Sequence, residues 1–374
     1  MDCLKRVLSL CAVLLLLPVL ACGEGENTQA EVAEILSRMT LREKICQMII
    51  VSPEALSSSD RVVSFDAQAR EEFELYPFGG MLIYGKNIEN KEQLSAYTGA
   101  LSSLSPAPFI LAEEEGGEVS RVAWKLGLQG EDFPENIAAG NNPAMLYAAG
   151  KNIGGYLRET GFNMNLSPVA DLTSVYEVDE LLGRTSSSRP DSAAVIVQQY
   201  AAGMTEAGII PVYKHFPGLG SENIDSHEVI PRIDKADDEL YSEDILPFRA
   251  GIESGIPCIM MSNAIYTQLD RKEPACFSSH IIKDILRGEL GFEGVIMTDA
   301  QDVPAIRDAY TEEDAIIKAI SAGCDIILMP RDPQKAVYVI EKAVASGIIS
   351  EEQINESAGR IISLKLASGI WNEE

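Results

Sequence analysis

Short apolar runs bounded by turn residues recur along the chain, and longer segments with apolar residues at helical spacing separate them. Most of the runs are apolar throughout and rich in β-branched residues, Leu and Met, which is typical of strands buried on both faces of a parallel sheet. This pattern predicts strands at residues 45–51, 80–84, 109–112, 162–168, 209–215, 258–262, 294–298 and 325–329. It predicts helices at 143–160, 192–207, 238–255 and 311–322, and two more, 333–345 and 350–367, after the last strand.

Eight strand-then-helix units in one chain favour an α/β fold, a single-domain (β/α)8 barrel of the TIM type. A doubly wound open sheet is the alternative, but no glycine-rich fingerprint follows the first predicted strand. No linker or break in composition interrupts the chain after residue 30. We therefore predict one barrel domain over residues 31–374.

The first residues have the features of an export signal. Lys5 and Arg6 precede an apolar stretch, residues 7–20, that is too short for a membrane span. The stretch leads into Ala21-Cys22-Gly23, which resembles the site at which bacterial prolipoproteins are cleaved and lipidated. We predict a signal peptide at 1–21, a lipidated Cys22 with a polar tether over 22–30, and an extracytoplasmic protein anchored to the membrane by lipid. An ordinary secretory signal with an accidental cysteine is the alternative.

The composition of the chain argues against several classes of function. The net charge of −27 would repel a phosphate backbone, so no nucleic-acid partner is expected. The four cysteines of the barrel region, at 46, 258, 276 and 324, match neither a zinc site nor a CxxC motif, and most lie in apolar runs. We expect buried free thiols there, no metal and no cofactor.

In a parallel barrel the chemistry lies just past the carboxyl ends of the strands, and polar clusters follow four of the predicted strands. The third leads into three adjacent acids, Glu113 to Glu115, which must be solvated, paired or catalytic. Gly183-Arg184 follows the fourth, and this arginine could bind substrate or form a salt bridge.

The fifth and seventh predicted strands carry the candidate acid–base groups. The fifth ends in Lys214-His215, and the Gly/Pro-rich loop after it contains Asp225 and His227, so that two of the three histidines lie in one segment. An aspartate two positions from a histidine can orient and charge the imidazole for proton transfer. The seventh delivers Asp299, either a strand-end cap or a nucleophile on a rigid element.

Taken in order, these motifs resemble glycoside hydrolase family 3, in particular its single-domain bacterial exo-β-N-acetylglucosaminidases. The resemblance rests on GGMLIYGKNI, EEEGGEVSR, NMNLSPVAD, KHFPGLGSENIDSHEVIP, LRGELGFEGVIMTDA and AGCDIILMP, which span most of residues 31–370. It implies that Asp299 is the nucleophile and that His227, paired with Asp225, is the acid/base. It further implies that Lys214, His215, Arg184 and Glu113 bind the sugar, and that the partner is an amino-sugar glycan such as a muropeptide.

Three departures from the family pattern concern specificity. Glu113 replaces an aspartate, Glu118 replaces an arginine, and Leu219 replaces a histidine. None removes the nucleophile or the Asp–His pair. The sequence therefore predicts a retaining β-N-acetylhexosaminidase. A β-glucosidase, a β-xylosidase or a phosphorylase on the same fold, or a sugar-binding lipoprotein without turnover, are the alternatives.

Overall fold

Eight parallel strands form the centre of the computed structural model, which describes residues 21–132, 134–139, 142–172, 183–220 and 225–371. In chain order the strands are β1 (Ile49–Val51), β2 (Gly80–Leu82), β3 (Phe109–Ala112), β6 (Met164–Asn165), β7 (Ile210–Phe216), β9 (Cys258–Met261), β11 (Val295–Thr298) and β12 (Ile327–Leu328). From β1 to β11 each strand pairs with the next, and β12 pairs with β1. A parallel bridge between Met297 and Ile326 joins the two ends of the sheet, so the strands close into the predicted (β/α)8 barrel.

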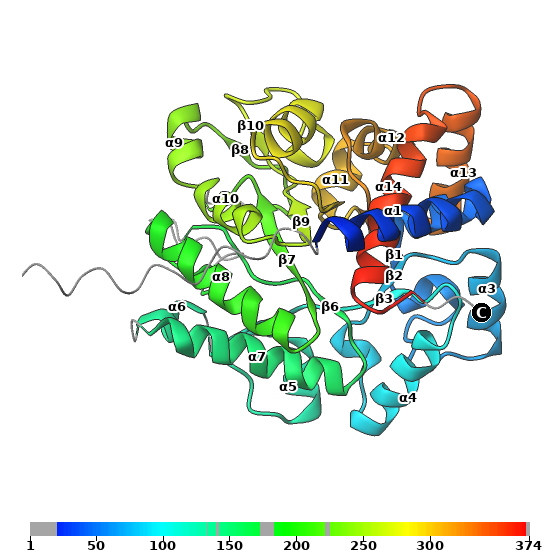
Figure 1. The fold of residues 1–374 in the computed structure, drawn as a ribbon, viewed down its shortest axis with the longest axis horizontal. Helices are drawn as coiled ribbons and strands as arrows, with labels where there is room; N and C mark the ends of the chain where they lie inside the picture. Colours follow the sequence, from blue (N-terminus) through cyan, green and yellow to red (C-terminus); the bar gives the residue numbers. More distant parts are fainter. Residues whose placement is uncertain (1–20, 133, 140–141, 173–182, 221–224, 372–374) are drawn as a thin grey trace, which may run out of the picture.

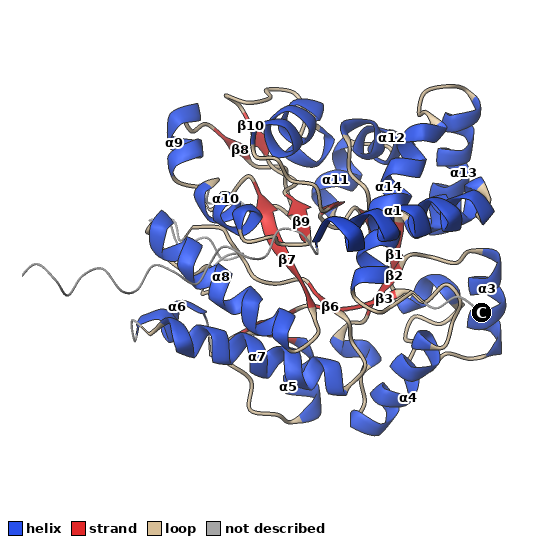
Figure 2. Ribbon diagram, in the orientation of Figure 1, coloured by secondary structure: helices blue, strands red, loops and turns tan. Residues whose placement is uncertain are grey.

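Helices surround this barrel on the outside (Figures 1 and 2). They are α1 (Ala21–Arg38), α2 (Leu41–Gln47), α3 (Ala67–Leu75), α4 (Lys91–Ser102), α5 (Arg121–Leu126), α6 (Pro134–Ala139), α7 (Pro143–Glu159), α8 (Pro190–Glu206), α9 (Asp237–Ser242), α10 (Leu246–Glu253), α11 (Pro304–Ala309), α12 (Glu312–Ala322), α13 (Pro333–Ala345) and α14 (Glu351–Ala367). Short 3-10 turns η1 (Pro53–Leu56), η2 (Gly85–Asn87) and η3 (Ala275–Phe277) and a π-helix, η4 (His280–Glu289), complete the ring. One continuous apolar core fills the space between helices and strands.

All eight predicted strands are present, but two element predictions are wrong in part. Residues 45–47 belong to α2, because Thr40 and Glu43 form a reciprocal capping box that starts a helix just before β1. The single helix predicted at 238–255 is two helices, α9 and α10. Pro247 cannot donate a backbone hydrogen bond and lies in the first turn of α10, where none is needed.

The predicted polar tether is helical in the structure. Helix α1 begins at Ala21 and packs against α14, across which it lies in Figure 1. The signal prediction for residues 1–20 lies outside the described residues. Among the described helices, none combines the length and apolarity needed to cross a membrane.

Two small two-stranded sheets lie near the carboxyl ends of the barrel strands. β4 (Glu114–Gly116) and β5 (Val119–Ser120) form an antiparallel hairpin after β3, and β8 (Arg232–Ile233) pairs with β10 (Ile265–Tyr266). The hairpin turn needs glycine at Gly116, since its φ is +94° and a Cβ there would lie 2.8 Å from the Asp132 carbonyl oxygen. The hairpin carries the acidic motif over the barrel mouth.

Cysteines 46, 258, 276 and 324 are buried and free, as predicted. They belong to the apolar core, where burial raises the pKa of the Cys258 and Cys324 thiols. A thiol in such surroundings is a packing group rather than a nucleophile.

Candidate active site

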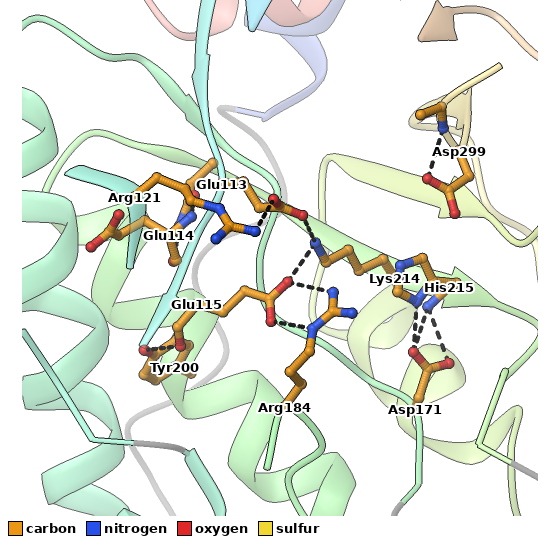
Figure 3. Close-up of polar contacts among 12 residues, drawn as sticks. Glu113, Glu114, Glu115, Arg121, Asp171, Arg184, Tyr200, Lys214, His215 and Asp299 are labelled. Carbon is orange, nitrogen blue, oxygen red and sulfur yellow. Dashed lines mark hydrogen bonds and ion pairs between the residues drawn. The ribbon is translucent and has the colours of Figure 1, made fainter. Parts of the chain in front are cut away.

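The predicted site residues lie on one rim of the barrel. Glu113 follows β3, Lys214 and His215 are near the end of β7, and Asp299 follows β11 directly. Because parallel strands end at the same rim, residues from distant parts of the chain converge there (Figure 3). The barrel thus brings together the candidates that the sequence could place only at strand ends.

The centre of the site is an ion cluster around Glu115. Arg184 donates to both carboxylate oxygens, through Nε at 2.9 Å and Nη2 at 2.8 Å, and Lys214 Nζ lies 2.6 Å from Oε1 (Figure 3). Lys214 also reaches Glu113 Oε1 at 3.2 Å, and Arg121 lies 3.6 Å from the other oxygen of Glu113. Of the two roles predicted for Arg184, the ion pair is present. Fixed charges of this kind hold donors in place for a polar ligand without reorganisation.

The cluster keeps its members charged. Burial by itself would neutralise Glu115, but Arg184 and Lys214 hold the pKa of this carboxyl well below its ordinary value. Burial likewise opposes the charge of Lys214, and the adjacent Glu115 and Glu113 raise the pKa of its ammonium above the usual value. Lys214 is therefore a permanent hydrogen-bond donor at neutral pH.

The three consecutive acids have three different environments. Glu113 and Glu115 both contact Lys214, whereas Glu114 between them is fully buried and turned elsewhere, as alternation along extended backbone requires. The carboxylate of Glu114 accepts the backbone N–H groups of Val122 at 2.7 Å and Ala123 at 3.2 Å. It therefore satisfies the first turn of α5 and fixes the position of Arg121 at the start of that helix.

His215 is oriented by a residue that the sequence prediction did not include. Asp171, beyond β6 and fully buried, lies 2.7 Å from Nδ1 of His215 and also accepts its backbone N–H. The backbone N–H of Leu219 donates to the same carboxylate at 2.6 Å, and the Leu219 side chain is buried. The leucine that departs from the family pattern thus belongs to the support of the site, and the peptide bond between Lys214 and His215 is cis.

Asp299 is nearly buried, with 8% of its surface exposed, and its Oδ1 accepts the backbone N–H of Ala300 at 2.7 Å. Tyr84, two residues after β2, lies within electrostatic range of both Asp299 and Glu113 of the ion cluster. Burial raises the pKa of the Tyr84 hydroxyl, and the carboxylates of Glu113, Asp302 and Asp299 raise it further. The nucleophile candidate, Tyr84 and the cluster therefore share one electrostatic environment.

The predicted Asp225–His227 pair forms. Oδ1 of Asp225 lies 2.9 Å from His227 Nδ1 and accepts the histidine backbone N–H at 2.8 Å. Both side chains are about half exposed, at 45% and 46%. The backbone N–H of Ala305 donates to the His227 carbonyl at 2.9 Å, which attaches the pair to the segment that follows Asp299.

Four residues of the site were given no catalytic or binding role by the sequence prediction: Tyr84, Glu115, Arg121 and Asp171. Arg121 is the last residue of the motif EEEGGEVSR, which also contains Glu115, and Asp171 is the last residue of NMNLSPVAD. Tyr84 lies within GGMLIYGKNI, so the sequence carried a signal for all four. Glu118 is exposed on the hairpin turn. In the described ranges, no group of three or more His, Cys, Asp or Glu side chains is arranged to hold a metal ion.

A closed parallel barrel with an aspartate and an Asp–His pair at its carboxyl-end rim is an architecture suited to glycoside hydrolysis. The family model for the glycosyl hydrolase family 3 N terminal domain matches residues 40–364. The chain therefore belongs to glycoside hydrolase family 3, as the motifs predicted.

Similar proteins carry hexosaminidase names. A β-hexosaminidase of Alkalilimnicola ehrlichii is 32% identical over 290 residues, which cover 75% of this chain and 82% of that enzyme. β-Hexosaminidase A of Pseudoalteromonas piscicida is 30% identical over 322 residues, and the match covers 78% of this chain but 53% of that protein. This chain thus spans about half the length of the Pseudoalteromonas protein.

Among solved structures, a family 3 β-N-acetylglucosaminidase from Paenibacillus sp. superposes with a TM-score of 0.81 at 28% identity, covering 89% of this chain and 63% of that one. A β-N-acetylhexosaminidase from Beutenbergia cavernae gives a TM-score of 0.76 at 26% identity, covering 88% of this chain and 99% of that one. The barrel is therefore of the same fold as these enzymes.

Proposed function

We propose that the protein is a retaining exo-β-N-acetylhexosaminidase that removes terminal amino sugars from muropeptides or related glycans. The hexosaminidase names of the relatives support this substrate class. We assign Asp299 as the nucleophile, His227 as the acid/base and Asp225 as the group that orients its imidazole. Lys214, Arg184, His215 and Glu113 form the sugar-binding part of the site.

In the first step, a carboxylate oxygen of Asp299 attacks the anomeric carbon while His227 gives its proton to the departing glycosidic oxygen. The bond to the leaving group breaks, and a glycosyl ester of Asp299 remains. In the second step, neutral His227 accepts a proton from water, the water oxygen attacks the anomeric carbon, and Asp299 leaves as a carboxylate. Each step inverts the configuration at the anomeric carbon, so the product retains the configuration of the substrate. Neither step needs a cofactor.

The single observation that carries the proposal is the Asp225–His227 pair beside the segment that follows Asp299. A histidine with one ring nitrogen on a carboxylate is suited to move a proton near neutral pH. The ion cluster supports the sugar-binding part of the proposal, because Lys214 and Arg184 hold charged donors beside Glu113.

A panel of nitrophenyl glycosides tests the function. We expect turnover of the β-N-acetylglucosaminide well above that of the β-glucoside and β-xyloside. Asp299→Asn should lower turnover by at least about 10³-fold while the variant remains folded, and a 2-fluoro sugar with a good leaving group should label Asp299.

The panel also separates the alternatives. Strong stimulation by phosphate would indicate a phosphorylase, and sugar binding without turnover would indicate a binding protein. A label on another residue would refute the assignment of Asp299.

We further propose that Cys22 carries a lipid that anchors the protein outside the cytoplasmic membrane. The support is the apolar segment followed by Ala21-Cys22-Gly23. Acyl chains contribute about 0.8 kcal/mol per buried CH₂, enough to hold an acidic protein at a membrane. Cys22→Ser should therefore move the protein from the membrane fraction to the soluble fraction, whereas Cys3→Ser should not. Unchanged fractionation of the Cys22→Ser variant would contradict the anchor.

A further inference from the structure

The loop that follows Asp299, residues 300–305, is fixed by hydrogen bonds to buried groups of neighbouring strands and loops. The side chain of Gln301 is buried, and its amide nitrogen donates to the Asp299 carbonyl at 2.9 Å and to Asn263 Oδ1 at 3.4 Å. The backbone N–H of Gln301 donates to the Leu328 carbonyl at 3.0 Å, and Asn263 donates to the Ala300 carbonyl at 3.3 Å. These hydrogen bonds make the loop rigid.

Asp302, the next residue of this loop, is exposed, whereas Gln301 before it is buried. Three positions further on, Ala305 binds the His227 carbonyl, so the loop joins the nucleophile at one end to the acid/base at the other. Asp302 lies midway along this connection, and neither the catalytic nor the sugar-binding assignment uses it.

Asp302 also interacts electrostatically with both catalytic candidates. Partial desolvation and the negative charge of Asp299 raise the pKa of the Asp302 carboxyl, while Arg307 and His227 act in the opposite direction. Asp302 is also among the carboxylates that raise the pKa of the Tyr84 hydroxyl, together with Glu113 and Asp299. Its carboxylate therefore lies within electrostatic range of Asp299, His227 and Tyr84.

We propose that Asp302 is a specificity-determining residue that excludes anionic acceptors from the glycosyl-enzyme and favours water and other neutral molecules. This inference rests on the proposed function, because it concerns the second step of that reaction. The acceptor must approach the anomeric carbon on the side of His227, and Asp302 is an exposed residue of the rigid loop that connects Asp299 to His227. A fixed carboxylate there repels an incoming anion and leaves a neutral acceptor unaffected.

Azide and methanol are the acceptors that separate charge from base catalysis. A nitrogen of azide attacks the anomeric carbon, the carbon–oxygen bond to Asp299 breaks, and its electron pair returns to the carboxylate; no proton is transferred. Methanol reacts in the same way, but His227 accepts its hydroxyl proton. A variant that merely damages the base would therefore slow methanol and leave azide unchanged.

The experiment uses the full-length protein trapped as its 2-fluoro glycosyl-enzyme and measures the second-order rate constant for reactivation by each acceptor. For Asp302→Asn, and for Asp302→Ser as a second variant, we expect the azide constant to rise about three- to tenfold. The methanol constant should stay the same. The gain should shrink as sodium chloride is added, because salt screens the charge. Asp284→Asn, which removes an exposed carboxylate from η4, is the matched control and should leave both constants unchanged.

An unchanged azide constant, or equal changes with both acceptors, would overturn the role of Asp302. Failure of the proposed function would look different, because the wild-type protein would then form no 2-fluoro glycosyl-enzyme or would prefer another glycoside of the nitrophenyl panel. Trapping of each variant also shows that it is folded before its acceptor selectivity is compared.

Discussion

Single side chains in this site take their roles from the residue that orients each of them. Asp225 holds His227 through both the ring Nδ1 and the backbone N–H, so the proposal assigns proton transfer to Nε2. Asp171 holds His215 in a comparable way, but that pair is buried and the backbone of Leu219 shares the carboxylate. The exposed pair suits proton exchange with substrate and solvent, whereas the buried pair suits a fixed binding group.

His227→Ala should be selective for the leaving group. A sugar alkoxide needs a proton to depart, whereas a dinitrophenolate does not. We therefore expect a loss of about 10²–10⁴-fold in the glycosyl-enzyme formation step with a disaccharide, and a much smaller loss with a dinitrophenyl glycoside. Single-turnover measurements are needed, because His227 also serves as base in the second step.

His280 provides a matched control for this variant. Its Nδ1 lies 2.9 Å from Asp284, the same kind of exposed pair on η4. His280→Ala should leave both substrates unaffected, and Asp225→Ala should show the selectivity of His227→Ala more weakly. Equal losses on both leaving groups would mean that His227 positions the sugar rather than protonating the leaving group.

At the scale of elements, the β4–β5 hairpin and helix α5 form one unit that carries binding groups to the barrel mouth. Glu114 connects them, since it accepts two backbone N–H groups of α5 and the hydroxyl of Tyr156 on α7 at 2.7 Å. Tyr200 on α8 donates to the Glu115 carbonyl at 2.8 Å and secures the hairpin from the other side. Arg121 at the start of α5 can face Glu113 only while this unit is in place.

Glu114→Ala should lower the free energy of unfolding by about 2–3 kcal/mol, because buried donors of α5 lose their acceptor. It should also raise KM more than it lowers kcat, since Arg121 is displaced while Asp299 is not. Urea unfolding and steady-state kinetics measure the two effects. Glu118→Ala on the exposed turn of the same hairpin should change stability by less than about 0.5 kcal/mol. Equal destabilisation by both substitutions would contradict the role of Glu114.

Elements and site differ in how far the sequence could predict them. All eight barrel strands were predictable because each is buried on both faces and most are largely apolar, with polar residues such as Lys214 and His215 near the carboxyl ends. The start of β1 was not predictable, because Ile45 and Cys46 at the end of α2 are apolar and belong to the same core as the strand. The ion pairs of Glu115 with Arg184 and Lys214 join residues 69 or more positions apart, so only the closed barrel could reveal them. Alternation along the acidic motif could have indicated that Glu114 points away from Glu113 and Glu115.

At the scale of the whole molecule, helix α14 ties the end of the chain to the base of the barrel through a buried lysine. Lys365 is fully buried, and its Nζ donates to Gln47 Oε1 at 2.7 Å and to the Ala107 carbonyl at 2.9 Å. The rings of Phe109 and Trp371 lie 4.9 and 5.9 Å from this nitrogen. Burial lowers the pKa of Lys365 to about 7, which makes this group a reporter of folding near neutral pH.

Lys365 should make stability depend on pH in a defined direction. In the unfolded chain its pKa returns to about 10.4, so between about pH 7 and pH 10 the unfolded state binds one more proton than the folded state. The free energy of unfolding should therefore rise with pH across this window, by up to about 1.4 kcal/mol per pH unit from this group. Below pH 7 both states hold the proton, so the contribution is flat and its cost is fully present.

Lys365→Met isolates this contribution. The variant loses two hydrogen bonds at every pH, but it also loses the titrating group, so the stability of the wild-type protein relative to the variant should increase from pH 7 to pH 9.5. Urea unfolding at four or more pH values measures this difference. Lys91→Met, which removes a surface lysine paired with Glu159, should give a difference independent of pH over the same range. Parallel curves for the wild-type protein and Lys365→Met would mean that Lys365 keeps its proton in the folded barrel, with the two oxygen acceptors and the two rings stabilising a buried ammonium.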